Sequence, residues 1–529
     1  MLNVRKPVIG LEIHIELKTK TKMFCDSLND PDEKRPNFNV CPICMGHPGT
    51  LPVANKDAIY DVIKAGLALN CHINSDTFFE RKNYFYPDLP KGYQITQYQK
   101  PFCYEGYLEI SLLRQGFGGQ ANLKSQISKQ IRVTRIHLEE DAGRLYHPEG
   151  TNYSLVDYNR AGVPLMELVT EPDFENGQEV KKFAEELQLI MRYLHISDAD
   201  MEKGQLRVEV NISLTGDGPD AKSIEDPRFD FRAWLESNRD KWGTKAEIKN
   251  LNSIRAAANA VDYEIKRQNE ILDDGGKIIQ ETRGWDETKG ITFSQRSKEE
   301  AHDYRYFPEP DLPPIHFKES ELEVIKKSLP ELPEQRRARF KKLYILPESD
   351  IEIFTVNKSL GDYFEEVASE LLSFDNLEHL KRPDAEHQEK LYKIASNYLI
   401  TELNRMAGEV MKSPGETKIS AGDFADLIVR IFHKEISSSA AQTVLREMFE
   451  TGNDPGEIIK IKDLAQVSDT GELEMIIDKI IDANAGAVQD YKKGKEASLK
   501  FLIGMVMRES RGKANPQLVE EILLKRLTK

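Results

Sequence analysis

Apolar and polar residues alternate one by one in several short segments of the N-terminal half of the chain. In 11–17 (LEIHIEL), leucine and isoleucine take every second position, and two glutamates and a histidine lie between them. The segment 206–214 (LRVEVNISL) repeats this pattern, and 131–140 (IRVTRIHLEE) begins in it and slips by one residue at Arg135. Successive side chains of a strand point to opposite faces, and such a slip is typical of a bulge. We therefore predict antiparallel strands with one packed face and one polar face.

Helical periodicity replaces this alternation after Pro313. Apolar residues spaced three and four apart predict helices over 384–408, 420–434, 437–450 and 472–483. In the first half, the same spacing predicts helices over 56–69 and 254–272. The second of these has an N-cap at Ser253 and ends at Gly275.

The two patterns together predict an α+β fold. Its N-terminal part is an antiparallel, β-rich domain with flanking helices, and its C-terminal part is all-α. We expect the β-rich domain at 1–315, a partly helical connector at 316–378 and a helical region at 379–529. Segments 115–120 and 215–242, rich in Gly or in Asp and Pro, are interpreted as a hairpin and a surface excursion inserted between strands.

The composition is that of a soluble globular protein, with 529 residues of which 39% are hydrophobic and 30% charged. No apolar run approaches the ~18 residues that span a bilayer. The start MLNVRKP enters strand-like sequence at Val8, which leaves no room for a signal peptide. We therefore expect no membrane partner and a cytoplasmic location. The net charge of −15 argues against a general nucleic-acid coat, although a local basic patch could still bind phosphates.

Residues 81–98 (RKNYFYPDLPKGYQITQY) combine four tyrosines, a phenylalanine, three cations and two prolines. The prolines stiffen the backbone, and aromatic faces beside cations suit a base, a ribose or a phosphate. A proline turn between two edge strands, with half-buried tyrosines, explains the same residues equally well. The sequence contains no G-x-x-x-x-G-K-[S/T] loop, so any ATP must be held by another route.

Carboxylates inside otherwise apolar strands are the strongest chemical signal. Glu167 lies in VPLMELV without a nearby compensating charge, and a buried carboxylate is costly unless it is paired or bound to a metal. Glu12 and His14 share a strand face about 6.5 Å apart, and HLEEDAG adds three more carboxylates at 139–141. Oxygen donors with a single imidazole favour magnesium or manganese over zinc. The alternative is that Glu12 and Glu16 pair with Arg or Lys across the sheet.

Three of the five cysteines could form a zinc site. Cys41-Pro-Ile-Cys44 follows Cys25 and precedes His47, and a closed zinc site takes four such ligands. A redox C-x-x-C is not favoured, because the strand-to-helix setting of thioredoxin is absent. Ordinary free thiols explain these residues equally well, and an odd, small number of cysteines argues against a disulfide framework.

One basic island lies near the C-terminus, in 491–515. Its apolar residues Leu499, Leu502, Ile503 and Val506 are expected to pack inward and leave the cations exposed. In an acidic chain this island is the best candidate for contacts with a nucleic-acid backbone, and a solvated helix face is the alternative. The cations are Lys492, Lys493, Lys495, Lys500, Arg508, Arg511 and Lys513.

Long motifs across the chain resemble one family, the B subunits of aspartyl/glutamyl-tRNA amidotransferases (the GatB/GatE family). The resemblance rests on GLEIHIELKTKTKMF, RKNYFYPDLPKGYQITQY, TRIHLEEDAGRL, SLVDYNRAGVPLMELVTEPD, EIKNLNS, QETRGWDE and RSKEEAHDYRYFPEPDLPP, in this order. The tail YKKGKEASLKFLIGMVMRESRGKANPQLV resembles the YqeY-type C-terminal region of that family. The match covers nearly all of the chain, and long motifs in a fixed order are highly specific.

The resemblance implies a ligase of protein biosynthesis that uses ATP and magnesium. Family members work in a heterotrimer with the amidase subunit GatA, which releases ammonia from glutamine, and the small subunit GatC. GatB phosphorylates the side-chain carboxylate of Glu-tRNA(Gln) or Asp-tRNA(Asn), and ammonia then displaces the acyl phosphate. By this resemblance, 1–315 would form the catalytic cradle and the helical region would bind tRNA. The alternative is a non-catalytic subunit that only docks tRNA in the same complex.

The resemblance also implies roles for individual residues. The magnesium ligands of the family match Glu12, His14, Glu140 and Glu167. The candidates for neutralising the phosphates of the nucleotide or the acyl phosphate are Arg81, Lys82 and Lys91. Lys82 and Lys91 are also predicted to be catalytic, together with the four magnesium ligands. The candidates for shaping the pocket are Tyr84, Tyr86 and Tyr93. Further cavity candidates are Glu247, Lys249 and Asn250.

The chain departs from the family pattern in two places. Many relatives carry C-x-C before the C-x-x-C, whereas this chain reads Cys25-Asp26-Ser27, so zinc would be structural and is doubtful as a cofactor. The family strand with Asp between two small residues reads Val208-Glu209-Val210 here. A metal role at that position therefore stays open.

Overall fold

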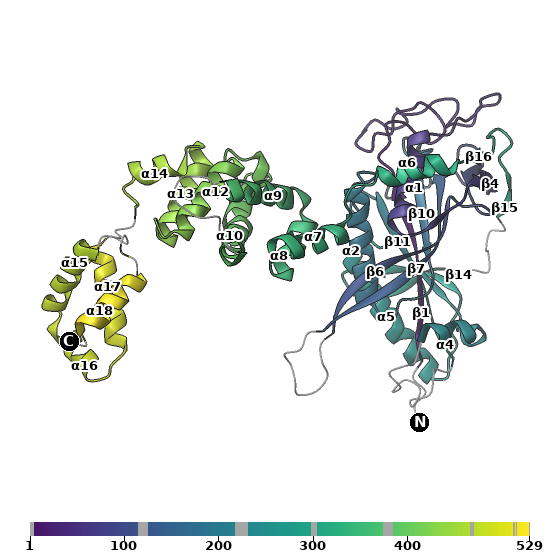
Figure 1. Ribbon diagram of the computed structural model, residues 1–529. Coiled ribbons are helices and arrows are strands. Elements are labelled where there is room, and N and C mark those ends of the chain that lie inside the picture. The colour runs from purple at the N-terminus through teal and green to yellow at the C-terminus, as the bar shows by residue number, and fades with distance from the viewer. Residues whose placement is uncertain are drawn as a thin grey trace. The chain divides into compact units, whose positions relative to one another are not determined.

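The computed structural model divides the chain into two compact units, Met1–Leu332 and Pro333–Lys529. In the described residues, a nine-stranded sheet dominates the first unit and the second is helical, which confirms the predicted α+β class (Figure 1). None of the described helices is both long and apolar enough to span a membrane. The described residues are 5–114, 125–216, 231–297, 304–373, 385–465, 470–510, 514 and 516–527.

The large sheet is centred on the strand that contains LEIHIE, β1 (Pro7–Glu16). It pairs antiparallel with β10 (Pro164–Thr170) on one side and with β11 (Leu206–Leu214) on the other. The strand order is β14-β13-β12-β11-β1-β10-β7-β6-β2, and of these described pairs only β12–β13 is parallel. The other strands are β2 (His72–Ile73), β6 (Cys103–Arg114), β7 (Ser125–Glu140), β12 (Ala246–Lys249), β13 (Glu281–Asp286) and β14 (Ile291–Ser297).

The predicted slip near Arg135 is confirmed as an irregularity in β7. Arg135 is opposite Val169 of β10, but the next pair joins Thr170 to Val133, so one residue of β7 is passed over. A shift of one residue moves all later side chains to the other face of a strand. Val133 therefore faces the core, while His137 lies on the polar face.

The other face of β1 packs against helices. Its apolar residues Ile9, Leu11, Ile13 and Ile15 are at most 1% exposed and belong to one large core. That core is covered by α1 (Lys56–Ala68), α2 (Gly177–Tyr193) and α5 (Ile254–Asp273) (Figure 1). Each helix begins at a side chain that accepts a hydrogen bond from its first turn, Asn55, Asn176 and the predicted Ser253. Gly275, with φ +76°, follows the end of α5, as predicted.

A three-stranded sheet lies beside β7 and contains residues 81–98. Its order is β15 (Arg305–Pro308), β4 (Glu80–Asn83) and β5 (Tyr93–Thr96), and the prolines lie in the connection between β4 and β5. The backbone of this segment thus forms a turn between two strands, of which β5 is an edge strand and β4 is the central strand. Apart from α4 (Phe231–Ser237), the remaining described elements of the unit are β3 (Asp76–Thr77), β8 (Arg144–Tyr146), β9 (Leu155–Asp157), β16 (Ile315–His316), α6 (Glu319–Lys327) and the short 3₁₀ helix η1 (Arg239–Lys241).

The two predicted excursions are described only in part. Segment 115–120 lies outside the described residues. In 215–242, the described residues include α4 (Phe231–Ser237) and a bridge between Thr215 and Trp242 that closes the segment at its base.

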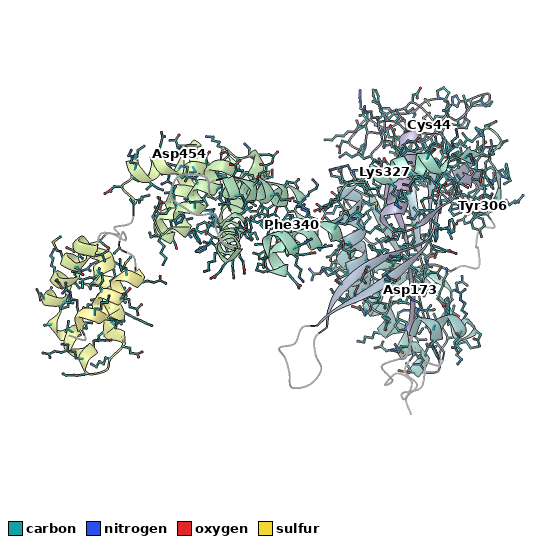
Figure 2. The ribbon with its side chains drawn as sticks, viewed as in Figure 1. Cys44, Asp173, Tyr306, Lys327, Phe340 and Asp454 are labelled. Carbon is teal, nitrogen blue, oxygen red and sulfur yellow. The ribbon has the colours of Figure 1, made fainter. Side chains whose placement is uncertain are left out.

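The second unit contains two groups of helices with separate cores. In the first, Phe340 (Figure 2) is fully buried, and so are Phe424, Leu427 and Ile428. This group comprises α7 (Pro333–Tyr344), α8 (Glu348–Val356), α9 (Lys358–Ser373), α10 (Ala385–Tyr398), α11 (Asn404–Glu409), α12 (Ala421–Phe432), α13 (Ser438–Thr451) and α14 (Pro455–Ile461), with a π turn at Leu399–Leu403 and a 3₁₀ turn at Pro414–Glu416. The second group comprises α15 (Thr470–Ala483), α16 (Ala485–Lys492), α17 (Ala497–Glu509) and α18 (Pro516–Leu527).

Candidate active site

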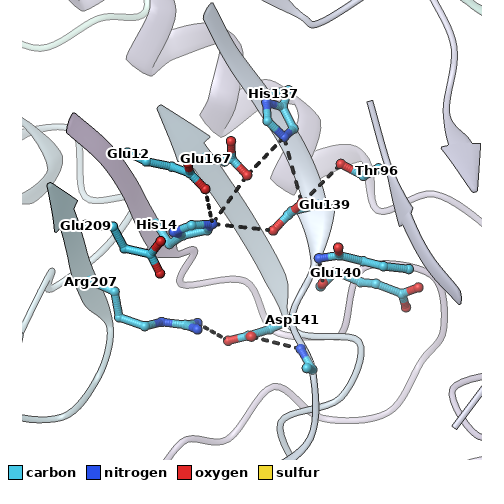
Figure 3. A network of polar contacts seen from close by, with 12 residues as sticks. Glu12, His14, Thr96, His137, Glu139, Glu140, Asp141, Glu167, Arg207 and Glu209 are labelled. Carbon is cyan, nitrogen blue, oxygen red and sulfur yellow. Dashed lines mark hydrogen bonds and ion pairs between the residues drawn. The ribbon is translucent and has the colours of Figure 1, made fainter. Parts of the chain in front are cut away.

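The register of three neighbouring strands gathers five ionisable side chains on the polar face of the sheet (Figure 3). His14 of β1 is opposite Glu167 of β10, and Glu167 is opposite His137 of β7. Glu12 and Glu139 are two residues away from these histidines along their strands, so they share the same face. We call these five residues the polar-face cluster.

Short distances join the members of this cluster. The Nε2 atom of His14 is 3.3 Å from Oε2 of Glu167 and 3.8 Å from the nearest oxygens of Glu12 and Glu139. The Nε2 atom of His137 is 3.4 Å from the same Oε2 of Glu167 and 3.8 Å from Glu139. Ligand atoms of Glu12, His14 and Glu167 lie within 4.8 Å of one another, and so do those of His137, Glu139 and Glu167. These separations suit metal coordination.

Charge in the cluster is concentrated and shielded from solvent. Glu139, Glu167 and His137 are 3%, 7% and 4% exposed. Burial alone would lower the pKa of both imidazoles, but the neighbouring carboxylates, Glu167 above all, raise the pKa of His14 and of His137 to about 9. Burial alone would raise the pKa of Glu167, and the two histidines instead hold it well below its usual range. The carboxylates of the cluster therefore favour the protonated, positively charged form of both histidines.

Glu140, which was predicted as a magnesium ligand together with Glu12, His14 and Glu167, does not lie with them. Its side chain is on the other face of β7, because successive residues of a strand alternate (Figure 3). One oxygen accepts a hydrogen bond from Lys91 Nζ at 2.5 Å, and the other accepts from the backbone N–H of Ile95 at 2.8 Å. Glu139 occupies the corresponding place in the cluster, and its Oε2 accepts a hydrogen bond from Thr96 at 3.1 Å.

The three predicted phosphate-binding cations have different surroundings. Arg81 makes a two-bond ion pair with the buried Glu309, at 2.7 and 2.8 Å, and Lys91 pairs with Glu140. Lys82 forms no ion pair with a described residue. Burial would lower the pKa of Lys82, but the charges of Glu139 and Glu167 contribute to raising it.

Aromatic rings line the side of the cluster that carries Lys82. Its ammonium lies 4.8 Å from the ring centre of Tyr304, which packs edge-on against Tyr84. Tyr306 (Figure 2) stacks on Tyr98 with ring centres 4.7 Å apart. Tyr93 lies under the Arg81 guanidinium, and Tyr86 is 52% exposed on the connection between β4 and β5. No role was predicted from the sequence for Tyr304 and Tyr306. Tyr306 lies in β15, and Tyr304 directly precedes that strand.

A second set of charges continues along the same face. Asp141 accepts a hydrogen bond from Arg207, and Arg207 is also 3.7 Å from Glu16. Lys249 pairs with Glu209 at 2.7 Å and approaches Glu247 at 3.5 Å, while Asn250 has a left-handed backbone with φ 58°. Glu16 and Glu209 therefore pair with cations across the sheet, which is the alternative to metal binding. Glu12 does not pair in this way, and its ion-pair partner among the described residues is His14.

The three cysteines of the predicted zinc site do come together. Sulfur atoms of Cys25, Cys41 and Cys44 lie within 4.8 Å of one another, but His47 does not join them as a fourth ligand among the described residues. Hydrogen bonding with Cys25 lowers the pKa of Cys44 to about 5, to which the backbone of Cys41 and the buried Lys22 contribute. Three donors do not close a tetrahedral zinc site. Cys25 and Cys44 line a pocket that also touches Lys91 and Glu140.

The basic island of the C-terminus lies on and before α17. Leu502 and Val506 are fully buried, as predicted, and the cations of Lys492, Lys493, Lys500 and Arg508 are exposed without an ion pair to any described residue. Lys495 is exposed and pairs with Asp490 at 3.1 Å. Arg511 and Lys513 lie outside the described residues.

Comparison with known proteins assigns this chain to a family. Residues 7–323 match the model of the GatB/GatE catalytic domain, and residues 384–527 match that of the GatB domain. The chain is 45% identical over 525 residues to the aspartyl/glutamyl-tRNA(Asn/Gln) amidotransferase B subunit of Carboxydothermus hydrogenoformans, covering 99% of this chain and 98% of the relative. It is 46% identical over 522 residues to the protein of that name from Caldanaerobacter subterraneus subsp. tengcongensis, covering 99% of each. The Persephonella marina protein of that name is 43% identical over 518 residues, or 98% of each chain. The chain therefore belongs to the family of B subunits of aspartyl/glutamyl-tRNA(Asn/Gln) amidotransferases.

Proposed function

We propose that this chain activates the side-chain carboxylate of Glu-tRNA(Gln), Asp-tRNA(Asn) or both with ATP, at the polar-face cluster. A carboxylate oxygen attacks the γ-phosphorus, the bond to the bridging oxygen breaks, and ADP leaves. Ammonia then attacks the acyl carbon, phosphate leaves and a proton is lost, which yields the amide. Phosphoryl transfer depends mainly on positioning and on neutralisation of charge. The observation that carries this proposal is the convergence of the cluster with Lys82 beside it.

The donor set fits a hard divalent cation. Magnesium in phosphoryl-transfer sites is held by one or two carboxylates together with phosphate oxygens of the substrate. Glu12 and Glu167, with His14 between them, would provide such a set on the central strands, and a bound ion would supply positive charge opposite the phosphates. The hydrogen bond from Thr96 fixes Glu139, so the strands and their neighbours hold the donors in place.

Lys82 is proposed as the cation that neutralises the transferred phosphate. Arg81 and Lys91 are each held by a buried carboxylate, so we assign them to fixing the hairpin of β4 and β5 beside the site. Lys82 is free of such a partner among the described residues, and the charges of Glu139 and Glu167 contribute to raising its pKa. A cation of this kind stabilises charge that develops on phosphate oxygens.

The aromatic wall is proposed to bind the nucleotide base or the 3′ end of tRNA. Stacking between a base and an aromatic ring is worth about 1–3 kcal/mol and tolerates any base. Tyr98 is 56% exposed and is already stacked on Tyr306, and Tyr86 lies exposed on the rim. A base can therefore stack on these exposed rings without a rearrangement of the sheet.

The partners are proposed from the family. The relatives are named as B subunits of an amidotransferase, so we expect a complex in which a GatA-type amidase supplies ammonia and a small GatC-type protein completes the heterotrimer. The exposed cations of α17 would contact the tRNA backbone. As an enzyme of translation, the complex would act in the cytoplasm.

The test compares ATP hydrolysis by the purified complex with and without mischarged tRNA. Glu12→Gln combined with Glu167→Gln removes two donors, so tRNA-stimulated hydrolysis should fall by at least ~10²-fold. Glu109→Gln, an exposed glutamate of β6, is the matched control and should retain the wild-type rate. If the chain only docks tRNA, the two glutamates take no part in ATP hydrolysis. The double variant would then bind tRNA normally and hydrolyse ATP at the wild-type rate.

A further inference from the structure

One arginine on the polar face of the sheet forms no side-chain hydrogen bond with a described residue. Arg135 precedes His137 by two residues in β7, on the same side of the irregularity of that strand, so both side chains lie on the polar face. The Nε atom of Arg135 is buried without a partner, and its Nη2 atom is 3.8 Å from Oε1 of Glu167. This distance is longer than a hydrogen bond. The N–H donors of the guanidinium are therefore unused in the part of the chain that the structure describes.

Other arginines of this unit are held by carboxylates. Arg132, three residues earlier in β7, donates hydrogen bonds from Nε and Nη2 to the two oxygens of Asp173, at 3.0 and 2.7 Å. Arg81 donates in the same way to Glu309, at 2.7 and 2.8 Å. Leaving a buried donor unpaired is costly, and the cost is greater for a charged group. Arg135 therefore differs from these arginines in a way that a bound anion would explain.

The neighbours of Arg135 do not supply that anion. In the adjacent strands, the residues directly opposite it are Val169 of β10 and Tyr104 of β6, and neither is a carboxylate. Glu167 lies diagonally across, but its Oε2 atom is 3.3 and 3.4 Å from the two histidines of the cluster, which already compensate its charge. The side chain of Arg135 is 31% exposed, so an anion from solvent can reach it.

The position of Arg135 relative to Lys82 indicates which anion fits. The hydrogen bond from Thr96 of β5 to Glu139 shows that the three-stranded sheet, which carries Lys82, lies at the Glu139 end of the cluster. Arg135 lies four residues before Glu139 on the same face, or about 13 Å along β7. Cations therefore lie at both ends of the cluster. A nucleotide polyphosphate is an anion whose charge extends over such a length, and phosphoryl transfer needs cations on both the transferred and the leaving phosphate.

A guanidinium also matches a carboxylate, so the side chain of the amino acid to be activated is the alternative ligand. Two hydrogen bonds from Arg135 would engage both oxygens of that carboxylate, one of which has to attack phosphorus, and would weaken it as a nucleophile. The leaving phosphate instead gains negative charge as its bond to the γ-phosphorus breaks. A hydrogen bond to it becomes stronger in the transition state and therefore accelerates the reaction.

We propose that Arg135 binds the diphosphate of ATP that leaves as ADP, at the end of the cluster opposite Lys82. This inference rests on the proposed function, because it assigns the direction of the nucleotide in that site. The substrate carboxylate forms a new bond to the γ-phosphorus, the bond to the bridging oxygen breaks, and its electron pair stays on the β-phosphate. Arg135 keeps its protons throughout and donates hydrogen bonds to the phosphate oxygens of ADP.

The probe is ADP with Mg²⁺, titrated calorimetrically into the purified full complex. Arg135→Met should weaken ADP binding by about 10–100-fold, because charge-assisted hydrogen bonds to phosphate are lost. Arg135→Lys keeps the charge without the planar guanidinium and should recover only part of the affinity. Arg144→Met is the matched control, because Arg144 is an exposed arginine of β8 without an ion pair to a described residue, and it should bind ADP as the wild type does.

Two further measurements separate a direct contact from an indirect effect through Glu167. The affinity of the Arg135→Met complex for Mn²⁺ without nucleotide should not fall, since the variant removes a cation and no ligand. Its melting temperature by circular dichroism should stay within a few degrees of the wild type. A folded Arg135→Met complex that binds ADP as the wild type does overturns the proposal. So does a variant that binds ADP normally but loses affinity for mischarged tRNA, because the anion would then belong to the tRNA or to its amino acid.

Failure of this inference is distinguishable from failure of the proposed function. If the wild-type complex hydrolyses ATP in response to mischarged tRNA while Arg135→Met binds ADP normally, the proposed function stands and only the role of Arg135 is wrong. If Arg135→Met loses ADP affinity but the wild-type complex shows no tRNA-stimulated hydrolysis, the phosphate site at Arg135 stands and the proposed function is wrong.

Discussion

The polar-face cluster and the basic island of the C-terminus are both groups of charged residues, but they differ in burial and in partners. In the cluster, charges of both signs converge from three strands, and Glu167 is 7% exposed. On α17 and the residues before it, charges of one sign are exposed, and Lys493 and Lys500 have no ion pair with a described residue. The first arrangement fixes positions, whereas the second leaves long side chains free to move.

This difference indicates two kinds of function. Buried, paired charges interact strongly at a fixed distance and lose much when one partner is removed. Exposed cations interact weakly with one another, are screened by salt and gain from any phosphate that approaches. We therefore expect changes in the cluster to alter the chemical step and changes in the basic island to alter tRNA affinity.

The largest expected effect comes from Lys82→Met. Removing the cation that faces Glu139 and Glu167 should lower the rate of tRNA-stimulated ATP hydrolysis by about 10²–10³-fold. The fold should persist, because Lys82 makes no ion pair with a described residue. Single-turnover hydrolysis at saturating tRNA measures the chemical step and separates it from tRNA binding.

Lys493→Met is the control for this prediction, since it also removes one lysine charge but from the basic island. Its single-turnover rate at saturating tRNA should equal that of the wild type. Equal rate losses in the two variants would mean that net charge, and not position in the cluster, limits the reaction.

The next largest effect concerns the buried pair of Lys91 and Glu140, whose side chains are 10% and 4% exposed. Lys91→Met leaves Glu140 with an uncompensated buried charge and should lower the free energy of unfolding by about 3–5 kcal/mol. All three tryptophans, Trp234, Trp242 and Trp285, lie in the first unit. Tryptophan fluorescence during urea unfolding of the full chain therefore follows that unit.

The double variant Lys91→Met/Glu140→Gln sharpens this prediction. Glutamine is neutral and retains an oxygen that can accept the hydrogen bond from Ile95, so much of the lost stability should return. If the double variant is less stable than Lys91→Met, the cost arises from lost packing and not from an unpaired charge.

The sequence was sufficient for the parts of the site that depend on one strand at a time. Strict alternation in 11–17 placed Glu12 and His14 on one face, and the isolated carboxylate in VPLMELV drew attention to Glu167. The slip at Arg135 was also visible in the sequence. Local alternation contains this information because it depends only on the strand period of two.

Choices that depend on distant partners could not be made from the sequence. The selection of Glu139 over Glu140 requires the register of β7 against β10, and HLEEDAG offers both residues side by side. Likewise, the counter-ion of Arg81 is Glu309, 228 residues away in the chain. The sequence therefore indicated all three cations of residues 81–98 as candidates, but it could not indicate which one has no carboxylate partner among the described residues.

A smaller effect is expected in the basic island. Lys493→Glu with Lys500→Glu should weaken tRNA binding by about 10-fold or more near physiological salt, because two phosphate contacts are lost. The slope of log affinity against log salt should become shallower by about 2. Filter binding across a salt series measures both. An unchanged affinity at low salt would assign these lysines to an ordinary solvated helix face.

The smallest effect should come from Asp490→Asn, which frees the one described lysine of the island that already has an acidic partner. Lys495 pairs with Asp490 at 3.1 Å, and the two side chains are 65% and 42% exposed. A surface pair of this kind contributes about 0–1 kcal/mol, so the stability of the chain should barely change. The released ammonium can then meet a phosphate, and tRNA affinity should rise by less than about fivefold at low salt and by nothing measurable at high salt. Weaker tRNA binding by Asp490→Asn would mean that Asp490 orients Lys495 for its contact, which would make this part of the island a fixed site like the polar-face cluster.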